Sequence, residues 1–331
     1  MQRDAAQREA TQREATQRDA AHGRAALELH APRAGAALDA LAAAAWRATR
    51  DAGVADLFDL ASRVVASQHG APPLARPAGL GTSPWHGVDA ARWRELAALD
   101  DGARPALAFA EQLAFDVASL GAAERGALFA SLGAAAGDFA QACYVADFAP
   151  RVRAALDALF GPSPAADGDA RAADAPALTE AFDLWIRVVP QLREVDAVTT
   201  ELVRLLGARR HRCRICQSLR SRAALVAGAD DAMFDAVDRY AQSDLSPAHK
   251  AALAFAEAMI STPFAVDASR ARALREQLPP AACVELVLDV ARNATNKVAV
   301  ALGGDAPRVE SGYEVYDVGP DGELLYGLEA P

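Results

Sequence analysis

Apolar residues recur at helical spacing through most of the chain. The helical pattern runs from Leu27 to Phe160 and resumes from Thr179 to about Leu302. Proline and glycine interrupt the first range at residues 70–87, which we expect to be a loop. A second break, at residues 161–178, has the composition of an interdomain linker. We therefore predict an all-α protein with two helical units, residues 27–160 and 179–305.

Both ends of the chain depart from this pattern. Residues 2–21 repeat a polar pentad four times, and a period of five forms no single apolar face on a helix. We expect residues 1–26 to be a frayed helix or a disordered tail. Residues 306–331 contain YEVYDVGPDGELLYG, which alternates around a Gly-Pro-Asp-Gly turn and predicts a short β-hairpin tail.

The two helical units share sequence. The hexapeptide ALAFAE occurs at Ala106–Glu111 and again at Ala252–Glu257, an offset of 146 residues. At the same offset Arg151-Val152 aligns with Lys297-Val298. We predict that the units are tandem copies of one ancestral repeat.

Local signals place several helices in the second copy. Ser246 is a good N-cap and Pro247 suits the first helical position. Another helix should begin near Pro279 or Pro280. Around the cysteines we expect a helix over about residues 192–208, followed by one that begins at the cysteine pair and runs toward Ala227.

Composition narrows the class of protein. The chain has 331 residues, 52% of them hydrophobic and only 6% aromatic, which suits alanine-rich helices. Its formal net charge of −10 argues against a nucleic-acid-binding protein. No window approaches a membrane span of about 20 apolar residues, and the N-terminus lacks the apolar core of a signal peptide. We therefore expect a cytoplasmic protein that binds neither nucleic acid nor membrane.

One short segment contrasts with this acidic background. RRHRCRICQSLRSR, residues 209–222, contains two cysteines and six arginines but no acidic residue. In a reducing compartment an isolated C-x-x-C pair indicates redox or metal chemistry. A helix N-terminus and nearby arginines would both lower the pKa of a thiol here. Zinc would need more ligands than Cys213, Cys216 and His211, so we predict neither a metal nor a cofactor.

The motif Glu-x11-Cys-x-x-Cys, formed by Glu201, Cys213 and Cys216, resembles the alkylhydroperoxidase D and carboxymuconolactone decarboxylase superfamily. LSPAHKAALAFAEAM and the following ELVLDVARNATNKVAVALGGD resemble later helices of that family. The resemblance implies two tandem helical repeats of the alkylhydroperoxidase D type. It also implies that Cys216 attacks a peroxide, Cys213 resolves the sulfenic acid, and Glu201 relays protons.

The chain departs from the family pattern at two places. The family has a histidine four residues after the second cysteine, where this chain has Arg220. Arginine cannot relay protons, although from one helical turn away it could stabilise a Cys216 thiolate. His211 is the nearest substitute relay, unless it is an exposed loop histidine. The first copy has cysteine-free VVASQHGAP in place of the pair, so we expect one redox site per chain.

The resemblance implies a thiol-dependent hydroperoxidase with peroxiredoxin-type activity. Its substrate would be a hydroperoxide, its reductant an external dithiol such as a lipoyl-linked one, and its state a homo-oligomer. One alternative is an enzyme like carboxymuconolactone decarboxylase, whose arginines bind a carboxylate. Another is a non-enzymatic thiol redox sensor.

Other residues have simpler interpretations. Glu201 could be a solvated helix residue that pairs with Arg204. Cys143 and Cys283 lie in apolar helical stretches and should be buried core thiols.

Overall fold

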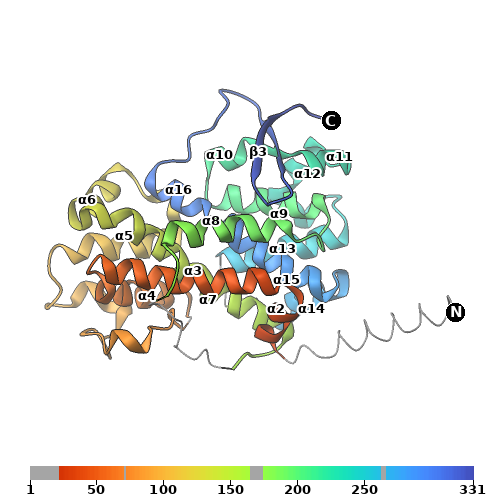
Figure 1. Cartoon of the computed structure of the whole chain (residues 1–331). Coiled ribbons are helices and arrows are strands. Elements are labelled where there is room, and N and C mark those ends of the chain that lie inside the picture. Colours follow the sequence, from red (N-terminus) through yellow and green to blue (C-terminus); the bar gives the residue numbers. More distant parts are fainter. Residues whose placement is uncertain (1–21, 71, 165–173, 262–265) are drawn as a thin grey trace.

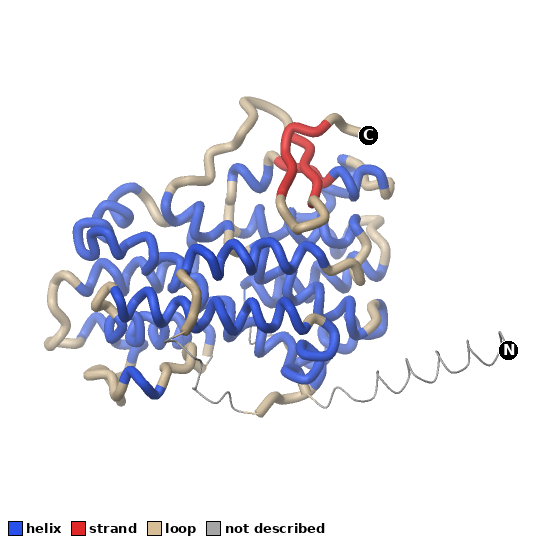
Figure 2. The backbone as a smooth tube through the Cα atoms, viewed as in Figure 1, coloured by secondary structure: helices blue, strands red, loops and turns tan. Residues whose placement is uncertain are grey.

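The computed structural model describes residues 22–70, 72–164, 174–261 and 266–331. Helices dominate these residues, and a small sheet lies near the C-terminus (Figures 1 and 2). This confirms the predicted all-α class. The pentad segment and half of the predicted linker, residues 165–173, lie outside the described residues.

The first part of the chain contains α2 (Gly23–His30), α3 (Pro32–Asp51), α4 (Ala55–His69), η1 (Ala78–Leu80), η2 (Ala90–Glu95), α5 (Ala103–Asp116), η3 (Val117–Ser119), α6 (Ala122–Leu132), η4 (Gly133–Ala135) and α7 (Ala136–Phe160). The second part contains α8 (Leu178–Val188), η5 (Val189–Gln191), α9 (Ala197–Arg210), α10 (Arg214–Gln217), β1 (Leu219–Ser221), α11 (Arg222–Val226), α12 (Asp231–Ala236), η6 (Val237–Gln242), α13 (Pro247–Ser261), α14 (Ala268–Gln277), α15 (Pro280–Asn293), α16 (Asn296–Leu302), β2 (Glu314–Val318) and β3 (Leu324–Leu328).

The two sets of helices share one core. In Figure 1 helices α4 to α6 gather on the left and α9 to α14 on the right. Between them α3 packs beside α8, and α7 packs against α15. Helices of each set also contact the other set, because α2 packs against α15, α14 packs against α7, and α16 packs against α7 and η3. The halves therefore bury one continuous apolar interior.

Equivalent helices recur at the offset seen in the sequence. Helices α3 and α8 begin at Pro32 and Leu178, and α6 and α14 begin at Ala122 and Ala268, in both cases 146 residues apart. The predicted duplication stays a prediction, but this equal spacing of elements supports it.

Two buried cations make reciprocal contacts between the halves. Arg151 on α7 donates to the carbonyl of Ile260 at 2.5 Å, and Lys297 on α16 donates to that of Ala114 at 3.2 Å. Donors and acceptors are again each 146 residues apart. Both cations also bind the buried carboxylate of Asp147, at 2.6 Å. Each half thus supplies a cation that binds a carbonyl at the C-terminal end of a helix in the other half.

Several local predictions are confirmed. The Ser246 hydroxyl accepts from the backbone N–H of His249 at 3.1 Å, and α13 begins at Pro247. Helix α15 begins at Pro280. Cys143 and Cys283 are fully buried, and burial raises the pKa of Cys283 to about 12 and that of Cys143 further. Both thiols are therefore un-ionised core residues at neutral pH.

The hairpin forms as predicted and docks on the helices. Strands β2 and β3 pair antiparallel, and β1 adds to β2 in parallel, giving the order β1-β2-β3. The turn packs against the end of α8, where a Cβ at Gly322 would lie 1.8 Å from the carbonyl oxygen of Arg187. Only glycine permits this approach together with the positive φ of 78°. Among the described helices, none combines the length and hydropathy needed to span a bilayer.

Candidate redox site

The cysteine pair follows a well-defined helix. Asp196 caps α9 by accepting from the backbone N–H groups of Val198 and Thr199. The helix ends at Arg210, and Arg212 then takes a left-handed φ of 51°, the one positive φ among the described non-glycine residues. Such strain is often found at functional sites. Here it turns the chain so that Cys213 becomes the N-cap of α10.

The structure corrects the helix predicted from the cysteines to Ala227. Helix α10 has a single turn and ends at Gln217. Residues 219–221 instead form β1, because β2 offers them a parallel partner and Glu314 N–H donates to the Ser218 carbonyl at 2.8 Å. A separate helix, α11, begins at Arg222.

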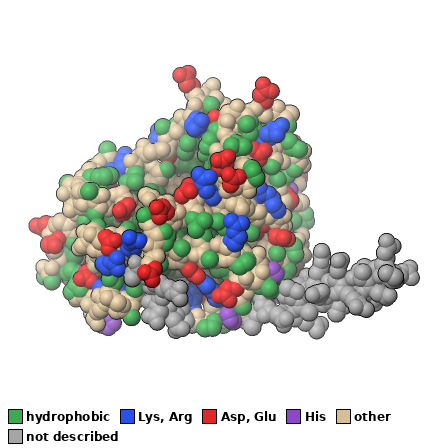
Figure 3. Space-filling model, viewed as in Figure 1, with side chains coloured by type: hydrophobic (Ala, Val, Ile, Leu, Met, Phe, Trp, Pro, Cys, Tyr) green, Lys and Arg blue, Asp and Glu red, His purple; other side chains and the backbone are tan. Residues whose placement is uncertain are grey.

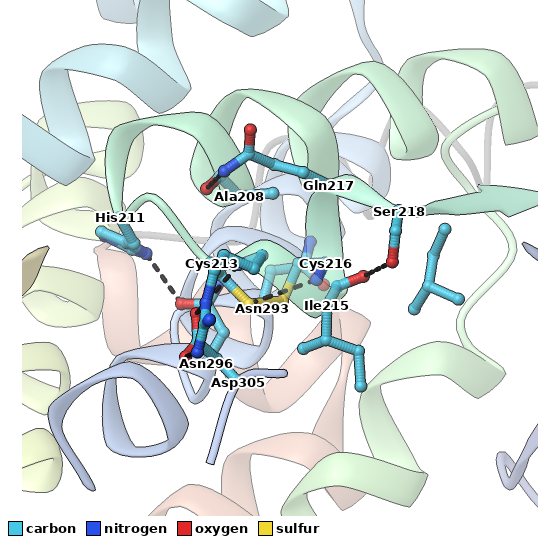
Figure 4. The surroundings of a disulfide bond; sticks show 12 residues. Ala208, His211, Cys213, Ile215, Cys216, Gln217, Ser218, Asn293, Asn296 and Asp305 are labelled. Atoms are coloured by element: carbon cyan, nitrogen blue, oxygen red, sulfur yellow. Dashed lines mark hydrogen bonds and ion pairs between the residues drawn. A yellow bond between two sulfur atoms is a disulfide. The ribbon is translucent and has the colours of Figure 1, made fainter. Parts of the chain in front are cut away.

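Cys213 and Cys216 form a disulfide, with the sulfurs 2.15 Å and the Cα atoms 5.3 Å apart (Figure 4). The two cysteines differ in exposure. Cys213 is completely buried, whereas Cys216 is partly exposed. The Cys216 N–H also donates to the Cys213 sulfur at 3.3 Å. A solution reagent would therefore reach Cys216 more easily than Cys213.

Asp305, which follows α16, holds the start of α10. Its carboxylate accepts from the Arg214 backbone N–H at 3.0 Å and from the Arg214 guanidinium at 2.7 Å. Its carbonyl accepts from the Ile215 N–H at 2.9 Å. The bond with Arg214 keeps the pKa of Asp305 below its usual value. Asp305 therefore satisfies two N–H groups that a one-turn helix cannot.

His211 lies beside the disulfide and is buried, not exposed (Figure 4). Its Nδ1 is 2.8 Å from Oδ1 of Asn296, an atom that can only accept, so Nδ1 carries the hydrogen. Burial, with the nearby charge of Lys297, lowers the pKa of His211 to about 3. The side chain is therefore a neutral imidazole at pH 7, with Nε2 in the acceptor state.

The carboxylate of Glu201 is buried and fully engaged. It accepts from Arg204 at 2.7 and 2.8 Å, from the Tyr316 hydroxyl at 3.0 Å and from the Ser221 N–H at 3.2 Å. The pairing with Arg204 expected for a solvated residue is present, but it lies in the protein interior. Arg204 in turn donates to the carbonyls of Cys216 at 2.7 Å and Leu219 at 2.9 Å.

Arg220 does not lie one helical turn from Cys216, because it belongs to β1. Its guanidinium donates to the carbonyls of Gln217 and Leu219, at 2.9 and 2.8 Å. It also lies 5.1 Å from the ring centroids of both Phe234 and Tyr313. Burial lowers the pKa of Arg220. The side chain thus braces the segment after the disulfide.

Half of the six arginines in residues 209–222 are paired with carboxylates. Acidic residues from other elements pair with Arg209, Arg210 and Arg214, namely Asp238, Glu257 and Asp305 respectively. Figure 3 shows the same intermixing of positive and negative side chains over one face of the molecule. Within the described ranges Arg212 and Arg222 are exposed and form no ion pair. The arginine-rich segment is therefore less cationic in the fold than in the sequence.

Sequence reasoning missed Arg204 as a link to the disulfide, and it missed Tyr316 and Asp305. Tyr316 lies in a segment whose alternating pattern predicts a strand, but this pattern does not indicate which residue its hydroxyl binds. In the part of the chain that the structure describes, no three His, Cys, Asp or Glu side chains are placed to hold a metal ion.

Two curated proteins are similar to this chain. They are the uncharacterized proteins Rv2313c and MT2376 of Mycobacterium tuberculosis, from strains ATCC 25618 / H37Rv and CDC 1551 / Oshkosh. Each is 41% identical over 231 residues, which is 66% of this chain and 79% of the relative. No protein-family model matches the chain, and no solved structure matches it.

Proposed function

The chain belongs to the same protein family as Rv2313c and MT2376, and we propose that it performs thiol–disulfide redox chemistry at Cys213 and Cys216, with a hydroperoxide as oxidant. The observation that carries the proposal is the disulfide itself, whose two sulfurs differ in exposure. The resemblance of the Glu-x11-Cys-x-x-Cys motif to the alkylhydroperoxidase D superfamily supports the choice of oxidant.

The exposure of the sulfurs supports a division of roles. The partly exposed Cys216 is the better placed nucleophile, and the buried Cys213 is the better placed resolving thiol. A buried resolving thiol meets the sulfenic acid only within the same chain, at a Cα separation of 5.3 Å. Intramolecular closure is therefore fast relative to further oxidation.

The proposed cycle has three steps. The Cys216 thiolate attacks the terminal oxygen of R–O–O–H, which breaks the O–O bond; with one proton this gives Cys216–SOH and ROH. Cys213–SH then displaces water and forms the disulfide. An external dithiol is finally oxidised to its own disulfide and returns both cysteines to thiols.

Proton supply to the leaving oxygen should limit the rate. His211 with a pKa of about 3 is a poor acid at neutral pH. Glu201 accepts four hydrogen bonds as a carboxylate, and Arg220 faces aromatic rings. Positioned acid–base catalysis is worth roughly 10²–10⁴-fold. We therefore expect turnover well below that of a peroxidase with a dedicated relay, with solvent water as the proton source.

The same arrangement favours a second candidate, a redox sensor that cycles its disulfide without rapid turnover. A specific observation supports the sensor: Arg204 and Tyr316 hold the Glu201 carboxylate in place, so that it is not free to relay protons beside the sulfurs. The support for the decarboxylase alternative is weaker than the sequence suggested, since Arg209, Arg210 and Arg214 already bind carboxylates of the chain.

A peroxidase assay tests the proposal. We expect the wild type to consume an alkyl hydroperoxide when a dithiol is supplied, and Cys216→Ser to lose all of this activity. In a second arm without the dithiol, Cys213→Ser should react once and stop, with a sulfenic acid on Cys216 that a dimedone probe captures. The readouts are peroxide consumption and peptide mass spectrometry.

The buried cysteines provide the matched control. Cys143→Ser and Cys283→Ser remove a thiol without touching the pair, so both should retain wild-type activity where they fold. Loss of peroxide consumption in Cys283→Ser with Cys216 still oxidised would contradict the proposal. A wild type that cycles its disulfide but turns over no peroxide would favour the sensor.

A further inference from the structure

We propose that Tyr316, on the C-terminal hairpin, is a positioning residue of the redox site that acts on Cys216 through Glu201 and Arg204. The inference rests on the proposed function, because it concerns how readily the Cys213–Cys216 disulfide forms. It assigns the hairpin a role in the chemistry and not only in covering the helices.

The first step is the contact between the hairpin and α9. The Tyr316 hydroxyl donates to Glu201 Oε2 at 3.0 Å, and the two residues are 115 positions apart in the chain. Both side chains are buried, with residue exposures of 7% and 1%. A buried hydrogen bond to a carboxylate is among the stronger neutral-to-charged bonds in proteins. The hydroxyl therefore fixes one oxygen of Glu201.

The second step is the ion pair that Oε2 of Glu201 forms with Arg204. Arg204 Nε donates to the same Oε2, and Arg204 Nη2 donates to Oε1. This is a bidentate pair, whose geometry is set by the planes of both groups. The Tyr316 ring also lies 5.4 Å from the Arg204 guanidinium carbon, which adds a cation–π contact. Tyr316 thus restrains both members of the pair.

The third step connects the pair to the sulfur. With its remaining donors Arg204 binds the carbonyl of Cys216 at 2.7 Å and that of Leu219 at 2.9 Å. These two carbonyls bracket the chain as it leaves α10 and enters β1. This guanidinium therefore restrains the Cys216 backbone, and with it the direction of the side chain, from the side opposite to the bond between the Cys216 N–H and the Cys213 sulfur. Tyr316, Glu201 and Arg204 form a continuous path of hydrogen bonds from the hairpin to Cys216.

The restraint from Tyr316 affects how often the Cys213 and Cys216 thiols of the reduced protein meet, that is, their effective concentration toward each other. A fixed Cys216 backbone keeps the reduced thiols in the geometry that closes the disulfide. Without the Tyr316 hydroxyl the Glu201–Arg204 pair remains but is less restrained, so closure becomes less favourable. We expect the equilibrium constant for disulfide formation to fall about three- to tenfold, where tenfold equals about 30 mV for a two-electron couple.

The experiment is a redox titration of the full chain in dithiothreitol buffers, with trapped thiols counted by mass spectrometry. The test variant is Tyr316→Phe. The matched control is Tyr326→Phe, which removes a hydroxyl from the paired position on β3, where the structure assigns it no hydrogen bond. Thermal melting of each reduced protein measures the stability change separately.

We expect Tyr316→Phe to make the disulfide easier to reduce and Tyr326→Phe to match the wild type. Arg204→Lys keeps the charge but cannot bind the carboxylate and both carbonyls, so it should shift the midpoint further in the same direction. Equal midpoints for Tyr316→Phe and Tyr326→Phe would overturn the inference while leaving the proposed function intact. A wild-type disulfide that cannot be reduced and re-formed would overturn the proposed function as well.

Discussion

The imidazole of His211, beside the disulfide, should make the stability of the fold depend on pH. His211 stays uncharged in the fold down to a pKa of about 3, against 6.5 for an ordinary histidine, mainly because burial disfavours its charged form. Between these pH values the unfolded state binds a proton that the native state does not. The contribution of His211 to the free energy of unfolding therefore falls as pH falls from about 6.5 to about 3, by at most about 1.4 kcal/mol per pH unit.

His211→Gln tests this sign. Urea unfolding of the variant and the wild type should give a stability difference that favours the wild type at pH 7 and shrinks on acidification. His86→Gln changes an exposed histidine and should give a difference that does not vary with pH. A His211→Gln difference that stays constant from pH 7 to pH 4 would show that His211 takes up its proton equally in the folded and unfolded states, so that burial does not keep it neutral.

At the scale of elements, the sequence predicted what local signals encode and missed what distant partners decide. Helices α13 and α15 begin where Pro247 and Pro280 place them, since a cap and a first-turn proline act within one turn. Strand β1 has three residues and forms only because β2 pairs with it from about 95 residues later. The interval from Cys213 to Ala227 consists mostly of helix-forming residues. Ser221, which caps α11 by accepting from the Ala224 N–H, is a local sign of a new helix start but does not reveal the strand before it.

The same lesson applies to the candidate site. The C-x-x-C spacing of Cys213 and Cys216 predicted redox or metal chemistry, and the structure joins the two sulfurs in a disulfide. The environment of Glu201 was not predictable, because the hairpin contributes to its restraint. The arginines were misread because their acidic partners lie on η6, on α13 and after α16. Long-range pairing of charges, and not the local charge of a segment, decides the field at the sulfurs.

Asp305 gives a prediction about the element that carries the disulfide. Asp305→Asn removes the ion pair with Arg214 and weakens the anchoring of α10. It also removes a negative charge near the point where an anionic thiolate must attack. Both effects should speed reduction of the disulfide by dithiothreitol, by about two- to fivefold. Acid quenching, alkylation and mass spectrometry give the rate, and the exposed Asp244→Asn, which should react at the wild-type rate, is the control.

At the scale of the whole molecule, the carboxylate of Asp147 links the two helical halves. Asp147 is completely buried on α7 and binds Arg151 from one half and Lys297 from the other, with His69 at 3.1 Å. The two cations hold the pKa of Asp147 far below its usual value against the opposing effect of burial. Its stabilising contribution is therefore present at neutral pH and is lost only as the carboxylate becomes protonated in acid.

Asp147→Asn removes the charge but keeps the shape, and it leaves two buried cations without their counterion. Breaking a buried ion pair by removing one partner typically costs about 3–5 kcal/mol. We expect a loss of that size in the free energy of unfolding, measured in urea at pH 7. Asp138→Asn lies in the first turn of the same helix, has no ion pair among the described residues and should cost well under 1 kcal/mol.

The cost should be shared by both halves, because Arg151 and Lys297 each bind a carbonyl of the opposite half. Hydrogen exchange of Asp147→Asn should therefore show faster exchange in α5 and α13 together, at the helix ends that contain Ala114 and Ile260. Faster exchange confined to α7 would mean that Asp147 stabilises only its own helix.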